Sequence, residues 1–225
     1  METLHNILLP YREVIGKVAS VVTIGQFFAG VFICRDIFKQ KSTKGISAVP
    51  FIGGVALGTL MLKYGFLLQD EAMLTVNIAA ILINLLYVIF YSVYTKNSWE
   101  EVYKPVSCGV LLVAVCLGYT EIESPELLEY RYGMLITVLM LLLLGSPLKD
   151  VGQIISSKDA SSIPFPITFM GAIVTFLWLL YGIVLDNTFM IVQNIVGFGL
   201  CVVQLVLILL YSKHPGVVKE NTKKD

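Results

Sequence analysis

Seven long apolar runs alternate with short polar segments along this chain of 225 residues. The runs cover residues 14–37, 46–68, 72–94, 106–120, 132–154, 163–185 and 188–211. A helix needs about 20 apolar residues to cross a bilayer. Because the runs are continuously apolar and do not alternate, they favour helices over the strands of a β-barrel. The pattern predicts an all-α membrane protein with seven transmembrane helices.

Composition and charge agree with a chain dissolved in a lipid bilayer. Hydrophobic residues make up 56% and charged residues 14% of the chain, and the mean hydropathy is +0.81. The 16 basic residues balance the 16 acidic ones, so nothing points to a nucleic-acid partner. The four cysteines lie in or beside apolar runs without the spacing of a metal site. We therefore expect neither a metal nor another cofactor.

Basic and acidic residues are segregated between alternate loops. Lysines and arginines follow the first, third, fifth and seventh runs, whereas acidic residues dominate after the second, fourth and sixth. Cytoplasmic loops accumulate Lys and Arg. This predicts an extracellular or luminal N-terminus and a cytosolic C-terminus. The compartment that we expect is the plasma membrane, the Golgi or both. A homo-oligomer is also possible from the sequence.

The chain contains an internal repeat at an offset of 117 positions, which brings Tyr64 onto Tyr181 and Asn77 onto Asn194. We divide the chain into a first triple-helix repeat (1–95), a linker helix with its flanking loops (96–131), a second triple-helix repeat (132–212) and a basic cytosolic tail (213–225). The linker crossing restores the chain direction. The two repeats therefore form parallel three-helix bundles, a 3+1+3 arrangement related by an axis along the membrane normal.

Two segments carry a resemblance to a known family. They read GQFFAGVFICRDIFKQKSTKGISAVPF and LLGSPLKDVGQIISSKDASSIPF, and each is followed by a Tyr-Gly pair and, twelve residues after that glycine, by an Asn. Over nearly its whole length up to about residue 212, the chain resembles animal and insect members of the SWEET (saliva-type) sugar transporter family. The resemblance implies a non-enzymatic, bidirectional carrier of monosaccharides such as glucose, working by alternating access.

Asn77 and Asn194 are the candidate substrate-binding residues that the repeat singles out. An amide both donates and accepts hydrogen bonds without charge, as a sugar hydroxyl does. The alternative is a structural bond between neighbouring helices. The resemblance adds Trp178 and its repeat mate Met61 to the binding site; from composition alone, Trp178 also fits a membrane-interface belt.

Pro50, Pro147 and Pro164 lie within or at the ends of predicted spans, where a proline removes a backbone hydrogen bond. They are candidate hinges, although Pro50 and Pro164 also suit the first turn of a helix. The resemblance implies a fourth hinge proline in the first helix, where this chain has Gly30.

Tyr64 and Tyr181 lie near the predicted outer ends of their helices, beside Asp70 in one loop and Asp186 and Asn187 in the other. Tyr64, Tyr181, Asp186 and Asn187 form a candidate outer gate. The alternative is that both tyrosines are ordinary residues of an interface belt.

No Asp, Glu or His lies in the middle of a span, so the sequence predicts transport without a coupled proton or sodium ion. One alternative is a PQ-loop amino-acid transporter of the lysosomal type, but Phe or Leu follows the three prolines where such a protein has Gln. A seven-helix receptor is a further alternative, and it would lack the repeat.

Overall fold

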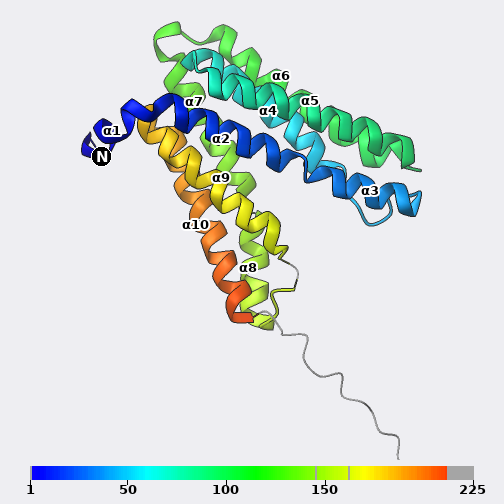
Figure 1. Ribbon diagram of the computed structural model, residues 1–225. Helices are drawn as coiled ribbons and strands as arrows, with labels where there is room; N and C mark the ends of the chain where they lie inside the picture. Colours follow the sequence, from blue (N-terminus) through cyan, green and yellow to red (C-terminus); the bar gives the residue numbers. More distant parts are fainter. Residues whose placement is uncertain (1, 145, 162, 212–225) are drawn as a thin grey trace, which may run out of the picture.

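The structure is a computed structural model that describes residues 2–144, 146–161 and 163–211. In the described part the chain consists of helices and their connections (Figure 1). The elements in chain order are α1 (Glu2–Leu8), η1 (Leu9–Tyr11), α2 (Arg12–Phe27), α3 (Gly30–Gln40), α4 (Val49–Leu68), α5 (Glu71–Tyr94), the π-helical turn η2 (Trp99–Tyr103), α6 (Lys104–Ile122), α7 (Pro125–Leu144), α8 (Ser146–Ser157), α9 (Phe165–Val184) and α10 (Thr188–Tyr211).

The predicted spans agree with the structure best where a run is uninterrupted, as in α4, α5, α9 and α10. Six helical segments of the described residues are long and apolar enough to cross a membrane. The remaining crossing of the 3+1+3 plan corresponds to α7 and α8. The single helix expected over 14–37 is wrong, because Phe28 and Ala29 divide this run between α2 and α3. The run over 132–154 is described as α7 and α8 on either side of residue 145, which lies outside the described residues. The segment before residue 14 is also helical.

The glutamate-rich stretch after the fourth run is not a long loop. Only Glu123 and Ser124 separate α6 from α7, so α7 begins at Pro125 and not at residue 132. The Glu123 carboxylate accepts hydrogen bonds from Tyr119 and from Arg131, at 2.8 Å, and from the Ser124 backbone N–H, at 3.0 Å. These donors lower the pKa of Glu123 from 4.5 to about 2. The corner stays tight because its acidic residue is fully hydrogen-bonded while ionised.

The helices form two arms that join at one end (Figure 1). In the first arm, α4 packs against α5 and α6, and α3 packs against α5; in the second, α10 packs against α7, α8 and α9. Helix α2 contacts both α5 and α9, and α4 contacts α7. One buried cluster contains residues from both arms, including Tyr64 and Tyr181, while two further clusters belong to one arm each. The arms are thus held together at one end and separate at the other.

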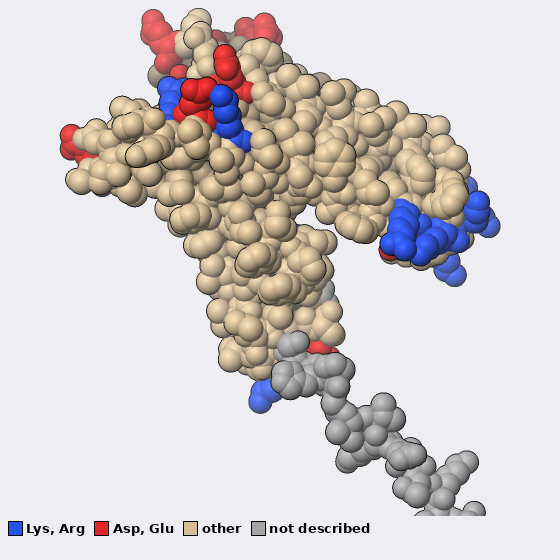
Figure 2. Space-filling view, in the orientation of Figure 1, with Lys and Arg blue, Asp and Glu red and all other residues tan. Residues whose placement is uncertain are grey.

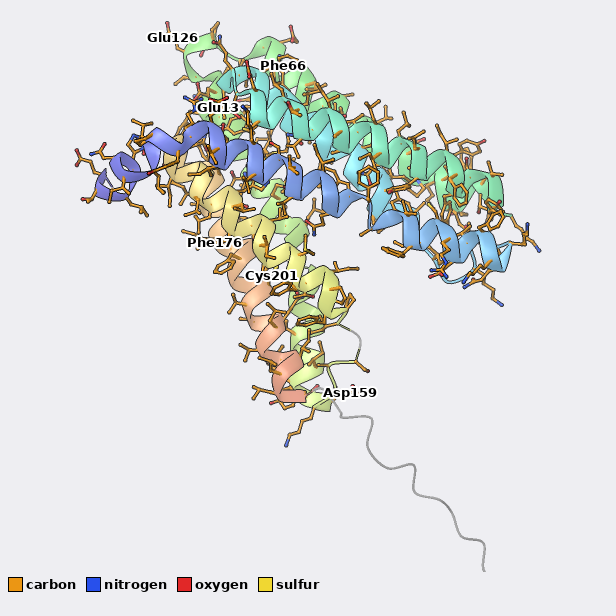
Figure 3. All side chains as sticks on the ribbon, viewed as in Figure 1. Glu13, Phe66, Glu126, Asp159, Phe176 and Cys201 are labelled. Atoms are coloured by element: carbon orange, nitrogen blue, oxygen red, sulfur yellow. The ribbon has the colours of Figure 1, made fainter. Side chains whose placement is uncertain are left out.

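We call the end with the connections at 69–70, 123–124 and 185–187 the joined end, and the ends with the connections at 41–48, 95–98 and 158–164 the divergent ends. Figure 2 shows basic side chains at the tips of the divergent ends and most acidic ones at the joined end. In Figure 3, Glu126 lies at the joined end, whereas Asp159 is an acidic residue at the divergent end of the second arm. The charge segregation seen in the sequence therefore has a spatial counterpart.

The repeat is visible in the backbone as well. Four non-glycine residues of the described part have a positive φ between 50° and 51°, and they form the pairs Lys41 and Lys158, and Gln69 and Asp186. The members of each pair are 117 positions apart. Because left-handed residues end helices at particular places, the two repeats share their turns as well as their helices.

Candidate functional site: a cavity between the repeats

A cavity of about 330 Å³ lies between the arms, with residues of α2, α4, α5, α7, α9 and α10 in its wall. The four predicted substrate-binding residues all line it: Met61, Asn77, Trp178 and Asn194. None of the described residues in its wall is charged, and none is a histidine. The cavity thus brings the four residues together in an uncharged environment.

Asn77 on α5 and Asn194 on α10 have the same local geometry. In each, the amide Nδ2 donates to the carbonyl four residues earlier in its own helix, Met73 or Met190, at 2.8 Å. Neither amide oxygen accepts a hydrogen bond from the described residues. Among those residues, every side-chain nitrogen or oxygen that is fully buried has a hydrogen-bond partner. The oxygens are therefore accessible. Each amide leaves an acceptor and a second N–H for a ligand.

Trp178 is held by a residue that the sequence analysis missed. Its indole Nε1 donates to the Thr23 hydroxyl of α2 at 2.8 Å, across the boundary between the repeats. Thr23 in turn donates to the Ala19 carbonyl at 2.7 Å. The Trp178 ring also contacts Tyr181 edge-on, with ring centroids 5.7 Å apart. These contacts fix the plane of the indole ring.

The opposite wall of the cavity differs in chemistry. The offset of 117 places Met61 where the second repeat has Trp178, and Met140 of α7 where the first has Thr23. Both methionines line the cavity. One side therefore has a hydrogen-bonded indole, and the other has two flexible thioethers.

Two reciprocal hydrogen bonds close the joined end, and we call them the joined-end pairs. Tyr181 of the second repeat donates to the Asp70 carboxylate of the first at 2.6 Å, and Asn187 of the second repeat donates to the Tyr64 hydroxyl of the first at 2.8 Å. All four side chains are buried. Asp70 and Asn187 also accept the backbone N–H three residues ahead, at 3.0 and 2.9 Å, and so cap α5 and α10.

Asp186 was expected in this group, and Asp70 lies there instead. Asp186 is exposed and takes the left-handed turn position before α10. Asp70 is only 2% exposed and also lies 3.4 Å from the Arg12 guanidinium. The repeat held the missing information, because 117 positions separate Asp70 from Asn187.

Two glycines that the sequence analysis missed make room for the tyrosines. A Cβ on Gly16 would lie 2.8 Å from the Tyr181 ring, and one on Gly133 would lie 2.8 Å from the Tyr64 hydroxyl. Gly16 and Gly133 are again 117 positions apart. Each repeat thus provides a glycine surface against which the tyrosine of the other repeat packs.

The candidate hinge residues divide into two kinds. Pro50 lies in the first turn of α4, and Pro164 is the residue before α9, so both begin helices and interrupt none. Gly30 lies just after the break between α2 and α3, and Pro147 is the second residue of α8. The side chain of Pro147 lies outside the described residues.

Gly30 has a clear packing reason to be glycine. A Cβ there would lie 2.3 Å from the Tyr87 ring of α5. The Tyr87 hydroxyl donates to the carbonyl of Phe27, the last residue of α2, at 3.0 Å. Tyr87 thus satisfies a carbonyl at the break, which the sequence analysis did not predict.

The fold and the cavity together define the class: a duplicated three-helix membrane protein with a ligand-sized, uncharged cavity between its repeats. One family, MtN3/saliva, described as "Sugar efflux transporter for intercellular exchange", matches the chain twice, over residues 13–98 and 131–216. The chain belongs to this family. Membership decides against the receptor and the PQ-loop alternatives.

Several relatives match over most of the chain. The sugar transporter SWEET1 of Drosophila pseudoobscura pseudoobscura is 30% identical over 88% of this chain and 89% of its own. SWEET1 of Caenorhabditis elegans is 29% identical over 94% of this chain and 68% of its own. The bidirectional sugar transporter SWEET13 of Oryza sativa subsp. japonica is 24% identical over 94% and 73%.

The fold also matches a solved eukaryotic SWEET transporter. The TM-score is 0.79 at 21% identity, with 90% of this chain and 97% of the other covered. At this identity the comparison bears on the fold alone, and it supports the 3+1+3 arrangement expected from the repeat.

Proposed function

We propose that this protein carries a small neutral sugar, a monosaccharide such as glucose, across a membrane in either direction and without a coupled ion. The observation that carries the proposal is the pair of repeat-related amides, Asn77 and Asn194, in one uncharged cavity. A neutral polyol can hydrogen-bond to both amides without the desolvation cost of burying a charge. The names of the relatives support a sugar as the substrate.

The proposed mechanism is alternating access, with the joined-end pairs as the outer gate. In this conformation the pairs tie the repeats together at one end, while the arms separate at the other. Gly30 and Pro147 are the proposed hinges. Gly30 follows the break between α2 and α3, and Pro147 is its repeat mate in the second repeat, 117 positions later. Reopening at the joined end would require both tyrosines to release their partners.

The proposed orientation places the divergent ends in the cytosol and the joined end outside or in a lumen. The support is the concentration of lysines and arginines at the divergent ends (Figure 2). The structure would then represent a state closed to the outside. Protease accessibility of a tag at residue 225, in sealed cells and after permeabilisation, tests this orientation.

Sugar flux in proteoliposomes tests the function. We expect the parent protein to equilibrate labelled glucose in both directions, with the same rate in the presence and absence of a pH gradient. Asn77→Ala and Asn194→Ala should each reduce flux at least about tenfold, because each removes hydrogen bonds to the ligand from a low-dielectric site. Gly118→Ala is the matched control, since Gly118 is exposed and its Cβ would meet no other atom. Acceleration by a proton gradient, or full flux in both Asn variants, would refute the proposal.

A further inference from the structure

Besides Asn77 and Asn194, two more amide side chains line the cavity, and no prediction assigned either a role. Gln193 donates to the Thr137 hydroxyl at 2.7 Å, and the other is Asn84 of α5. Asn84 lies seven residues beyond Asn77, so the two side chains share one face of the helix. Helix α5 runs from the joined end toward the divergent ends. Asn84 therefore lies in the part of the cavity nearer the divergent ends, together with Phe27 and Gly54.

The spacing of the two amides matches the size of a sugar. Seven residues of α-helix rise by about 10 Å, and both side chains lean in the same direction along the axis. Two hydrogen bonds of about 2.8 Å each leave about 5 Å between the amides. A single pyranose ring has roughly this width, so one ring can reach from Asn77 to Asn84.

The amide of Asn84 is held in position by one hydrogen bond and keeps further hydrogen-bonding capacity. Its Nδ2 donates to the Ala80 carbonyl at 2.8 Å, the same bond that Asn77 and Asn194 make. Its oxygen accepts no hydrogen bond from the described residues. Because every fully buried side-chain oxygen among those residues has a partner, this oxygen is accessible. Asn84 thus presents the same free groups to the cavity as the two predicted amides.

Gly54 of α4 creates the space for this amide. A Cβ on Gly54 would lie 2.5 Å from Cγ and 2.6 Å from Oδ1 of Asn84. The amide therefore lies directly against the α4 backbone, which fixes its position in the wall.

The second repeat has the same packing without the amide. Gly171 and Cys201 are the repeat mates of Gly54 and Asn84, and a Cβ on Gly171 would lie 3.3 Å from the Cys201 sulfur. Figure 3 labels Cys201 on α10 in the second arm. Neither is among the described residues that line the cavity. A small apolar residue thus satisfies the packing of this position, and an amide is not needed for it.

We propose that Asn84 binds a hydroxyl group at the edge of the sugar that faces the divergent ends, which makes it a substrate-binding residue in addition to the four predicted ones. This inference rests on the proposed sugar transport. It makes the site asymmetric: Asn77 and Asn194 bind the sugar from both repeats, and Asn84 binds it from the first repeat alone.

The test is a double-mutant cycle in which one change removes the Asn84 amide and the other removes one hydroxyl group of the sugar. Equilibrium binding of glucose and of its single-deoxy analogues is measured on the purified full chain for the parent, Asn84→Cys and Cys201→Ala. Asn84→Cys introduces the residue that the second repeat already accepts here, and Cys201→Ala is the matched control. Thermal unfolding of each variant is measured alongside.

For Asn84→Cys we expect glucose affinity to fall about 2- to 10-fold, as for one lost hydrogen bond. One deoxy analogue should bind the parent more weakly by the same factor and lose nothing further in Asn84→Cys, because the two changes remove the same bond. Cys201→Ala should bind every ligand as the parent does. Parent-like binding by Asn84→Cys, or losses that add for every analogue, would overturn the assignment. Failure of the parent to bind any sugar would instead refute the proposed function.

Discussion

At the scale of single residues, the hydrogen bond between Trp178 and Thr23 explains why the two sides of the cavity differ. An aromatic ring whose plane is already fixed can stack on the apolar face of a sugar with less loss of side-chain freedom on binding. The bond of 2.8 Å fixes it from α2, the helix that contacts both arms. The methionine pair on the other side has no comparable restraint, since thioether chains are flexible. Sugar orientation should therefore depend on Thr23.

Thr23→Val tests this dependence with almost no change in volume. The variant leaves the indole N–H of Trp178 without its acceptor, and an unpaired buried donor costs about 1–3 kcal/mol. We expect weaker glucose binding, by about 3- to 30-fold, with a small loss of thermal stability, both measured on the purified protein. In a Trp178→Phe background the same substitution should have little further effect, because the donor is already gone. Equal losses in both backgrounds would contradict the role assigned to Thr23.

The sequence predicted which residues are candidates for the cavity and the gate better than it predicted the residues that they contact. The repeat singled out Asn77, Asn194, Tyr64 and Tyr181, because identical polar residues at one offset stand out among apolar ones. Thr23 and Gly16 were missed, because their partners belong to the other repeat and contact them only in the folded protein. Asp70 was left out of the candidate gate because its repeat mate is Asn and not Asp.

At the scale of elements, the break in the first crossing is the main feature that hydrophobicity could not predict. The apolar run continues across this break, so its length predicts one helix. The α2–α3 break is stabilised from outside by Tyr87, whose ring lies on Gly30 and whose hydroxyl binds the Phe27 carbonyl. Neither interaction leaves a periodic signal in the sequence.

Gly30→Ala tests whether the Tyr87 ring sets the break. A methyl group 2.3 Å from the ring must displace it, and overpacking of this kind costs about 1–3 kcal/mol. We expect a lower unfolding temperature in detergent. Tyr87→Leu should relieve the clash, so that the double variant loses less than the two single variants combined. Tyr87→Phe keeps the ring and is the matched control that should give no relief. Additive losses with Tyr87→Leu would contradict this account.

The linker region makes the two arms unequal. The Glu101 carboxylate of η2 accepts hydrogen bonds from Thr43, Tyr91 and Thr95 at 3.0, 2.8 and 2.6 Å. These bonds tie the 41–48 connection, the end of α5 and the linker together. In the second repeat, Ala160 and Ile208 stand where Thr43 and Tyr91 would be, and they have no hydroxyl groups. The first arm is thus braced by a segment that lies outside the repeat, which is why the repeat alone could not predict it.

At the scale of the whole molecule, the proposed alternating-access mechanism makes the joined-end pairs the contacts that set the balance between two conformations. The pairs are equivalent in geometry but not in charge, since Tyr181 donates to a carboxylate and Tyr64 accepts from an amide. Hydrogen bonds to charged groups are worth about 1.5–3 kcal/mol, against about 0.5–1.5 kcal/mol for neutral ones. The Asp70 pair should therefore contribute more to keeping the joined end closed.

Replacing Asp70 by Asn and, separately, Asn187 by Asp should shift the balance between open and closed joined ends in opposite directions. Asp70→Asn keeps the helix cap, because Asn and Asp cap equally well, but it removes the charge from the bond to Tyr181. A loss of about 1 kcal/mol would raise the ratio of open to closed joined ends about fivefold. Asn187→Asp should lower that ratio, because it places a charge opposite Tyr64. Spin labels at Glu71→Cys and Thr188→Cys, exposed positions 117 residues apart at the joined end, report the ratio as two distance populations once the four native cysteines are replaced. If both substitutions moved the populations in the same direction, the charge of the capping residue would not determine the balance between conformations. The two residues would then act only on helix stability, and other contacts between the arms would set the balance.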